Sequence, residues 1–151
     1  MKITAGIIIV ASALAVMVTA TASWGKCEEK RLVDHFSLEK YTGLWYEQFR
    51  DKCFMPEKGD CQESRYAQME GKKNQMFILH SQYKNNKTGF DTISGVGNCK
   101  GAHCEVKFKW FLPEGDYRIL DTDYQTYSIV YSCRTLFGVA KKEYVWLLTR
   151  E

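Results

Sequence analysis

The sequence predicts an all-β fold, an eight-stranded antiparallel up-and-down barrel, and three observations support this prediction. From residue 41 onward, short runs rich in Tyr, Phe, Trp, Val and Ile are separated by turn residues at intervals typical of antiparallel domains. Within several runs apolar and polar residues alternate, as in strands that bury one face. Sequential short hairpins favour closure into a barrel, because closure removes the exposed strand edges.

Eight runs qualify as strands, and residues that favour turns separate them. The runs cover residues 43–50, 62–70, 75–83, 90–97, 104–111, 116–121, 127–133 and 143–150. The turns between them include Glu70-Gly71-Lys72 and Pro113-Glu114-Gly115. The single helical candidate precedes the first strand, where Ser37 could cap one turn over residues 38–41.

Alternation within the runs predicts which side chains face the interior of the barrel. The predicted inward sets are Phe108, Trp110 and Leu112, then Tyr127, Ile129 and Tyr131, then Trp146 and Leu148, with Tyr117 and Ile119 also assigned to the wall. So aromatic an interior fits walls around a cavity for one small ligand. A solid aromatic core is the alternative.

The first 22 residues have the pattern of a secretory signal peptide. Lys2 precedes an uncharged apolar run, and Ala20-Thr21-Ala22 fits a small-x-small cleavage site. A signal anchor is the alternative, because the stretch is about 20 residues long. The small residues and the single basic residue favour cleavage. We therefore expect residues 23–151 to form one secreted, extracellular domain with no integral membrane segment after cleavage.

The six cysteines all follow the signal peptide, and their even number indicates disulfides in an oxidising compartment. Six cysteines allow many pairings. Cys53 with Cys61 and Cys99 with Cys104 could each close a short loop, which leaves Cys27 with Cys133. This last bridge would close a loop of about 106 residues, for which the chain-entropy model gives roughly 4 to 5 kcal/mol.

Composition and motifs weigh against several function classes. The formal net charge is only +3 and no run of Lys and Arg occurs, so no nucleic-acid partner is expected. Gly95-Val96-Gly97 lacks the third glycine of a nucleotide loop. Cys99, His103 and Cys104 offer three ligands where zinc takes four, so a disulfide is favoured, and no metal or cofactor is expected.

One sequence position is a candidate for modification. Asn86-Lys87-Thr88 is the only Asn-x-Ser/Thr sequon, and it lies in a polar stretch between two predicted strands. We expect an exposed loop there, glycosylated at Asn86 if the host glycosylates.

Three ordered motifs resemble the signatures of the lipocalin family. Phe36 followed by YTGLWYE at residues 41–47 resembles the first signature, residues 122–124 the second, and residues 147–150 the third. The stretches EVKFKWFLP and YSIVYSC are similar to the branch that contains apolipoprotein D and bacterial lipocalins. The resemblance covers about residues 27 to 151.

The resemblance implies structural roles for the signature residues, which are Gly43, Trp45, Thr122, Asp123, Tyr124 and Arg150. Gly43 would permit a close backbone approach, and Trp45 would plug the closed end of the barrel. Arg150 matches the arginine that packs across this tryptophan in the family. These residues are expected to hold the fold and to touch no ligand.

The resemblance also implies a ligand-binding set. Pocket-lining positions of the branch are matched by Tyr66, Phe108, Leu112, Trp146 and Leu148, and alternation adds Trp110, Tyr127 and Ile129. His80 falls on a polar, inward-facing position, so it could hydrogen-bond a ligand head group. A satisfied or exposed histidine is the alternative.

The cysteine pattern matches that of the family in part and departs from it in part. Cys27 and Cys133 match a bridge usual in lipocalins, whereas Cys61 matches a cysteine whose usual partner lies in a C-terminal tail. The sequence stops at Glu151, directly after the third signature, so we expect the flanking C-terminal helix of the family to be absent. Cys53 is then the nearest partner for Cys61.

The resemblance implies a secreted carrier that binds a small lipophilic ligand, such as a fatty acid, retinoid or sterol, inside the barrel. The alternative is a protein-recognition or inhibitor lipocalin acting through loops at the open end, including residues 98–103. A ligand-converting enzyme is a weaker alternative, because no nucleophile motif occurs and the even cysteine count argues against a free thiol. We expect no enzymatic activity.

Overall fold

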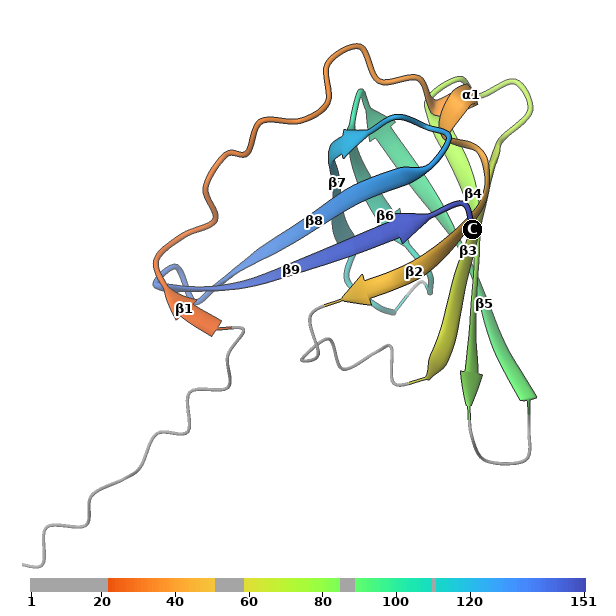
Figure 1. Cartoon of the computed structure of the whole chain (residues 1–151). Helices are drawn as coiled ribbons and strands as arrows, with labels where there is room; N and C mark the ends of the chain where they lie inside the picture. The colour runs from red at the N-terminus through yellow and green to blue at the C-terminus, as the bar shows by residue number, and fades with distance from the viewer. Residues whose placement is uncertain (1–21, 51–58, 85–88, 110) are drawn as a thin grey trace, which may run out of the picture.

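The computed structural model describes residues 22–50, 59–84, 89–109 and 111–151 (Figure 1). These residues form nine strands and one short helix. The elements are β1 (Ala22–Trp24), α1 (Leu38–Tyr41), β2 (Gly43–Arg50), β3 (Asp60–Gln68), β4 (Gln75–Lys84), β5 (Gly89–Lys100), β6 (His103–Lys107), β7 (Gly115–Thr122), β8 (Tyr127–Leu136) and β9 (Ala140–Thr149).

Eight of these strands close into an antiparallel up-and-down barrel, which confirms the predicted fold. Each strand from β2 to β9 pairs with the next one along the chain, and β9 pairs back onto β2. Each strand from β2 to β9 therefore has a paired strand on both sides, as barrel closure requires.

Strand β1 was not predicted from the sequence. It pairs antiparallel with residues 140–142 at the start of β9, beyond the part of β9 that pairs with β2. Ala22 belongs to this strand, although the signal-peptide pattern extends to this residue. The rest of that pattern, residues 1–21, lies outside the described residues.

Helix α1 and the turn after β3 lie at one end of the barrel, called here the closed end (Figure 1). The predicted helical turn is confirmed, because the Ser37 side chain accepts a hydrogen bond from the Lys40 amide at 3.3 Å. At the opposite, open end, strands β2, β4, β6 and β8 end.

The segment at residues 98–103 belongs to the closed end, so its assignment to the open end was wrong. Cys99 donates its amide to the carbonyl of Asn74, in the turn between β3 and β4. The turn between β5 and β6 must lie beside that turn, because consecutive antiparallel hairpins place every second turn at the same end.

The inward face of β8 is also opposite to the predicted one. Val130 and Ser128 are fully buried, and they stand beside the core residues Ile119 and Leu148 on the neighbouring strands. A small side chain is needed at position 128, because the Tyr41 ring fills the interior there and its hydroxyl lies 3.0 Å from Ser128 Oγ. Tyr127 and Ile129 consequently face outward.

Tyr131, the third member of that predicted set, is buried from the outside. Its hydroxyl donates to Glu143 at 2.7 Å, and the Lys30 ammonium lies 5.7 Å from the ring centroid. The N-terminal arm therefore covers Tyr131 on the outer wall. This large aromatic residue is buried although it points away from the barrel interior, so its size does not identify the inward face of β8.

The predicted run at residues 104–111 is too long. Strand β6 ends at Lys107, and the chain then bends into a turn in which the Leu112 amide donates to the Lys109 carbonyl at 3.1 Å. Leu112 is 43% exposed in this loop, so its place on the inner wall was wrong. Trp110, Cys53 and Asn86 lie outside the described residues.

Candidate ligand-binding site

The closed end of the barrel is sealed by Trp45 and Arg150. The guanidinium carbon lies 3.7 Å from the centroid of the buried indole, and Trp45 Nε1 donates to the Tyr41 carbonyl at 2.9 Å. Arg150 also donates to the backbone carbonyls of Leu44 and Thr42, at 2.8 and 3.0 Å. This arginine is thus satisfied by the fold itself.

Gly43 makes room for this seal. Its φ is +105°, and a Cβ atom there would lie 3.0 Å from Arg150 Nη1. A side chain at this position would press directly on the guanidinium, so the first signature places its glycine where the arginine needs space.

The second signature forms the turn that completes the seal. The Asp123 carboxylate accepts the Thr126 hydroxyl and the amides of Thr126, Tyr127 and Gln125, and these hydrogen bonds hold its pKa far below the usual range. The turn aims the Tyr124 carbonyl at Arg150, which donates to it at 3.0 Å.

A layer of tyrosine hydroxyls lies on the interior side of this seal. The Tyr117 hydroxyl lies 2.9 Å from that of Tyr41 and 3.0 Å from that of Tyr66. Burial raises the pKa of Tyr41 and Tyr117 well above 10, so both rings are neutral. The layer is a fully hydrogen-bonded polar floor across the barrel.

Two aromatic residues extend the inner wall beyond this floor. Phe108, just after β6, and Trp146 of β9 both pack against the core, and both side chains remain partly exposed. Gly95 allows Phe108 to lie close to β5, because a Cβ there would come within 2.8 Å of the Phe108 ring. Aromatic side chains with exposed surface inside a barrel are suited to contact a ligand.

His80 faces the same interior space. Its Nδ1 lies 2.9 Å from Ser64 Oγ on the neighbouring strand, and the side chain is buried. Burial, and then the nearby charge of Arg50, lower the pKa of His80 to about 4. The imidazole is therefore neutral at physiological pH.

An ion pair that was not predicted from the sequence lies on this inner wall. Strand β2 has a bulge between Glu47 and Phe49, so that Glu47 stands opposite Leu148 and Arg50 stands opposite Trp146. Leu148 and Trp146 both face inward, so the bulge puts two residues three positions apart on one face. Arg50 Nη1 donates to Glu47 Oε1 at 3.0 Å.

Two buried glutamines hold the backbone beside this ion pair. Gln82 Oε1 accepts the Gly59 amide at 2.9 Å, and Gln62 Nε2 donates to the Gly59 carbonyl at 3.0 Å. Arg50 Nη2 donates to the same carbonyl at 3.3 Å. Strict alternation could not reveal this group, because a bulge reverses the parity of a strand.

The predicted ligand set therefore divides. His80, Phe108 and Trp146 lie on the inner wall, and Trp146 stands opposite Arg50 of the ion pair. Tyr66 and Leu148 are buried in the core. Leu112 lies in a loop, and Tyr127 and Ile129 face outward from β8.

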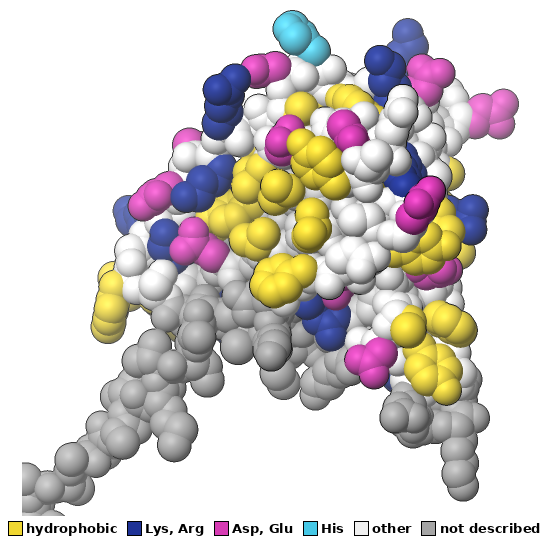
Figure 2. Space-filling model, viewed as in Figure 1, with side chains coloured by type: hydrophobic (Ala, Val, Ile, Leu, Met, Phe, Trp, Pro, Cys, Tyr) yellow, Lys and Arg dark blue, Asp and Glu magenta, His cyan; other side chains and the backbone are white. Residues whose placement is uncertain are grey.

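The outward residues contribute to an apolar area on the outer wall. Figure 2 shows hydrophobic side chains gathered over the front of the barrel, where β8, β9 and β2 lie. Leu147 of β9 stands between Phe49 of β2 and Ile129 of β8, and Val145 and Tyr46 are exposed beside this row.

Two disulfides are described. Cys27 is bonded to Cys133 across 106 positions, and Cys99 to Cys104 across 5. Cys61 is exposed and is bonded to no described cysteine.

The candidate metal ligands at residues 99–104 are otherwise engaged. Cys99 and Cys104 are consumed by their disulfide, and His103 Nε2 lies 2.8 Å from Asp116 Oδ1. Within the described ranges no three His, Cys, Asp or Glu side chains are grouped so that they could hold a metal ion.

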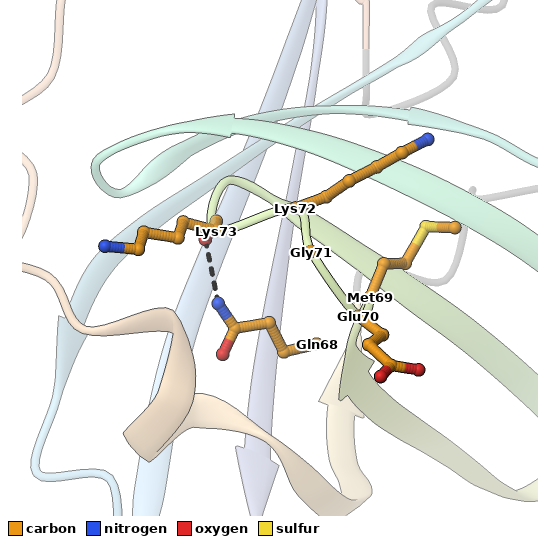
Figure 3. A pocket seen from close by; sticks show the side chains of 6 residues that line it. All are labelled: Gln68, Met69, Glu70, Gly71, Lys72 and Lys73. Atoms are coloured by element: carbon orange, nitrogen blue, oxygen red, sulfur yellow. Dashed lines mark hydrogen bonds between the residues drawn. The ribbon is translucent and has the colours of Figure 1, made fainter.

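Two surface hollows lie away from the inner wall. One lies at the turn after β3 and is lined by residues 68–73, with Gln68 Nε2 donating to the Lys73 carbonyl at 3.1 Å and the two lysines pointing apart (Figure 3). The other is lined by Lys40 and residues 123–125. Neither contains a residue of the predicted ligand set.

Comparison with known proteins places this barrel in a family. Residues 36–151 match the family model described as a lipocalin-like domain. The chain belongs to the lipocalin family. Apolipoprotein D of Macaca fascicularis is 34% identical over 130 residues, which cover 83% of this chain and 67% of the relative. The Lazarillo protein of Schistocerca americana is 30% identical over 145 residues, which cover 91% of this chain and 65% of the relative.

Solved structures share the lipocalin fold. Insecticyanin from Manduca sexta superposes with a TM-score of 0.75 at 19% identity, covering 87% of this chain and 72% of its own. H1 crustacyanin from the lobster Homarus americanus gives a TM-score of 0.68 at 16% identity, covering 89% and 76%. In the part of the chain that the structure describes, helix α1 is far too short to cross a membrane and no longer helix occurs.

Proposed function

We propose that this lipocalin is a secreted carrier that binds a small lipophilic molecule inside the barrel. The observation that carries the proposal is the inner wall between the tyrosine floor and the open end. There the partly exposed side chains of Phe108 and Trp146 pack against the core, and the same wall carries the buried polar side chain of His80. A largely apolar wall with a few polar groups is the usual form of a small-molecule site.

Family membership supports binding rather than catalysis. The chain spans about two thirds of the length of the apolipoprotein D relative, so the activity of the whole relative is not carried over. Two disulfides support passage through an oxidising compartment, in agreement with the secretory pattern of the leader.

Native mass spectrometry of the chain secreted from a eukaryotic host tests the carrier proposal. We expect a stoichiometric lipophilic adduct that is released on denaturation and can then be identified. The comparison variant is Phe108→Ala, which removes one of the aromatic side chains packed against the core and is expected to weaken the adduct. A native chain that never carries an adduct and binds no lipophilic probe would contradict the proposal.

Protein recognition at the open end is a second candidate. Phe111 and Phe137 lie in the connections after β6 and β8, and they are 61% and 98% exposed. Exposed aromatic loop tips are suited to contact a partner. A pull-down with the native chain and with Phe111→Ser/Phe137→Ser tests this candidate. Specific capture that the substitutions abolish, by a barrel that binds no lipophilic probe, would favour recognition over carriage.

A further inference from the structure

Two opposite charges of one strand, β2, face the inside of the barrel. The side chains of Glu47 and Arg50 are only 11% and 19% exposed, and their Oε1 and Nη1 atoms are 3.0 Å apart. Removing both charges from water is costly, and replacing such a pair by apolar residues is often neutral or stabilising. Stability therefore does not explain why this pair occupies the inner wall.

The geometry of the pair does not suit a role in holding strands together. Both residues lie on β2, three positions apart, and the bulge at Gln48 brings them onto one face. Among the described residues, the link from Arg50 to another element is the hydrogen bond to the Gly59 carbonyl at 3.3 Å. A cross-barrel clamp would instead join distant strands.

The surroundings hold the guanidinium in place and leave it able to bind. Gln62 and Gln82 are both buried and fix Gly59, the backbone group that Arg50 contacts. The contacts to Glu47 and Gly59 use Nη1 and Nη2, whereas a guanidinium carries five N–H donors. Trp146 stands opposite Arg50 on β9 and offers an apolar surface beside the charge.

We infer that Arg50 binds the carboxylate head group of an amphipathic ligand inside the barrel, while Trp146 and Phe108 contact its apolar tail. This inference rests on the proposed carrier function and names its ligand class. A guanidinium matches a carboxylate through two parallel N–H donors, which a neutral head group cannot use equally well. Glu47 balances the charge of Arg50 in the empty barrel and competes with the incoming carboxylate.

This arrangement predicts opposite effects for the two partners of the ion pair. Arg50→Gln removes the donor, so affinity for an acidic ligand falls by about tenfold or more, the scale of a lost hydrogen bond to a charged group. Glu47→Gln removes the competing carboxylate, so affinity for the same ligand rises. General damage to the wall would weaken binding in both variants.

The experiment uses oleic acid and oleyl alcohol, which share a tail and differ in the head group. Binding of each is measured by quenching of tryptophan fluorescence in the native chain, Glu47→Gln, Arg50→Gln and the control Arg65→Gln. Arg65 is adjacent to the inward residue Tyr66 on β3, so its side chain faces outward. We expect the native chain and the control to prefer the acid, and Arg50→Gln to bind both probes alike.

The outcomes separate this inference from the carrier proposal. Equal binding of acid and alcohol by the native chain, unchanged in both variants, would overturn the role of Arg50 and leave the carrier proposal standing. Binding of neither probe by the native chain would overturn both for ligands of this class. If Arg50→Gln does not fold, Glu47→Gln/Arg50→Gln replaces it, because this pair of changes leaves no single charge on the wall, and the same loss of acid preference is expected.

Discussion

Two arginines inside this barrel differ in what surrounds them. Arg150 at the closed end stacks on Trp45 and donates to several backbone carbonyls, so every contact it makes belongs to the fold. Among the described residues, Arg50 on the inner wall contacts a carboxylate from its own strand and the carbonyl of Gly59. Burial of a charge therefore does not by itself reveal its role, whereas the groups that contact the charge do.

A large loss of stability is expected when the closed-end seal is broken. Arg150→Ala removes the cation–π contact and leaves the carbonyls of Leu44, Thr42 and Tyr124 without their donor. We expect a loss of about 3 kcal/mol or more in the free energy of unfolding. Urea denaturation followed by tryptophan fluorescence measures it. A loss below about 0.5 kcal/mol, the range of ordinary surface changes, would refute the view of Arg150 as a structural seal.

The two disulfides allow a second comparison of the fold. Cys27→Ser/Cys133→Ser opens the long loop and is expected to cost about 4 kcal/mol, because that bridge restricts most of the unfolded chain. Cys99→Ser/Cys104→Ser opens a loop of only 5 positions at the closed end and should cost about half as much. Thermal unfolding of both variants under oxidising conditions shows which of the two disulfides contributes more to stability. The reverse order would show that local packing outweighs loop length.

His80 adds a pH dependence to the inner wall. Its pKa is about 4 in the folded chain and about 6.5 when unfolded, so the unfolded state binds the extra proton first. This contribution to stability is fully present above pH 6.5 and is lost as the pH falls to 4, by up to about 3 kcal/mol. His80→Asn should flatten that part of the stability curve.

Denaturation between pH 7 and 4 measures the His80 effect. His35→Gln, a change on the exposed N-terminal arm, serves as the control and should leave the curve unaltered. Parallel curves for the native chain and His80→Asn would exclude His80 as the source.

The smallest effect is expected when the inner-wall pair is removed as a unit. Glu47→Gln/Arg50→Gln should change the free energy of unfolding by no more than about 1 kcal/mol, because the desolvation cost disappears together with the attraction. Chemical denaturation of this double variant and of Arg150→Ala under the same conditions compares the two losses in the free energy of unfolding. A loss as large as that of Arg150→Ala would mean that both arginines are structural.

Much of the fold could be predicted from local pattern. Strand β2 was predicted to the residue and the other seven barrel strands within a few residues, because turn residues and alternation mark them directly. The faces were less predictable. Tyr127 and Ile129 were assigned to the interior because they are larger than Ser128, yet the space there already belongs to Tyr41. Occupancy by a residue distant in sequence leaves no mark on the local pattern.

The inner-wall site shows the same limit. Phe108, Trp146 and His80 could be proposed from alternation and family positions, and Arg50 could not. Regular alternation from Trp45 turns Phe49 inward and Arg50 outward, and the bulge at Gln48 reverses both. Phe49 is 58% exposed as a result.

The sequence by itself determined the strand order, the barrel and the residues of the closed-end seal, because these depend on periodicity, turn chemistry and the three ordered motifs. Only the tertiary structure decided which side chains line the interior. A bulge shifts the parity of every residue beyond it, and a ring such as Tyr41 decides which neighbouring strand must carry a small residue. Both effects arise from contacts between strands, which no single strand records in its own sequence.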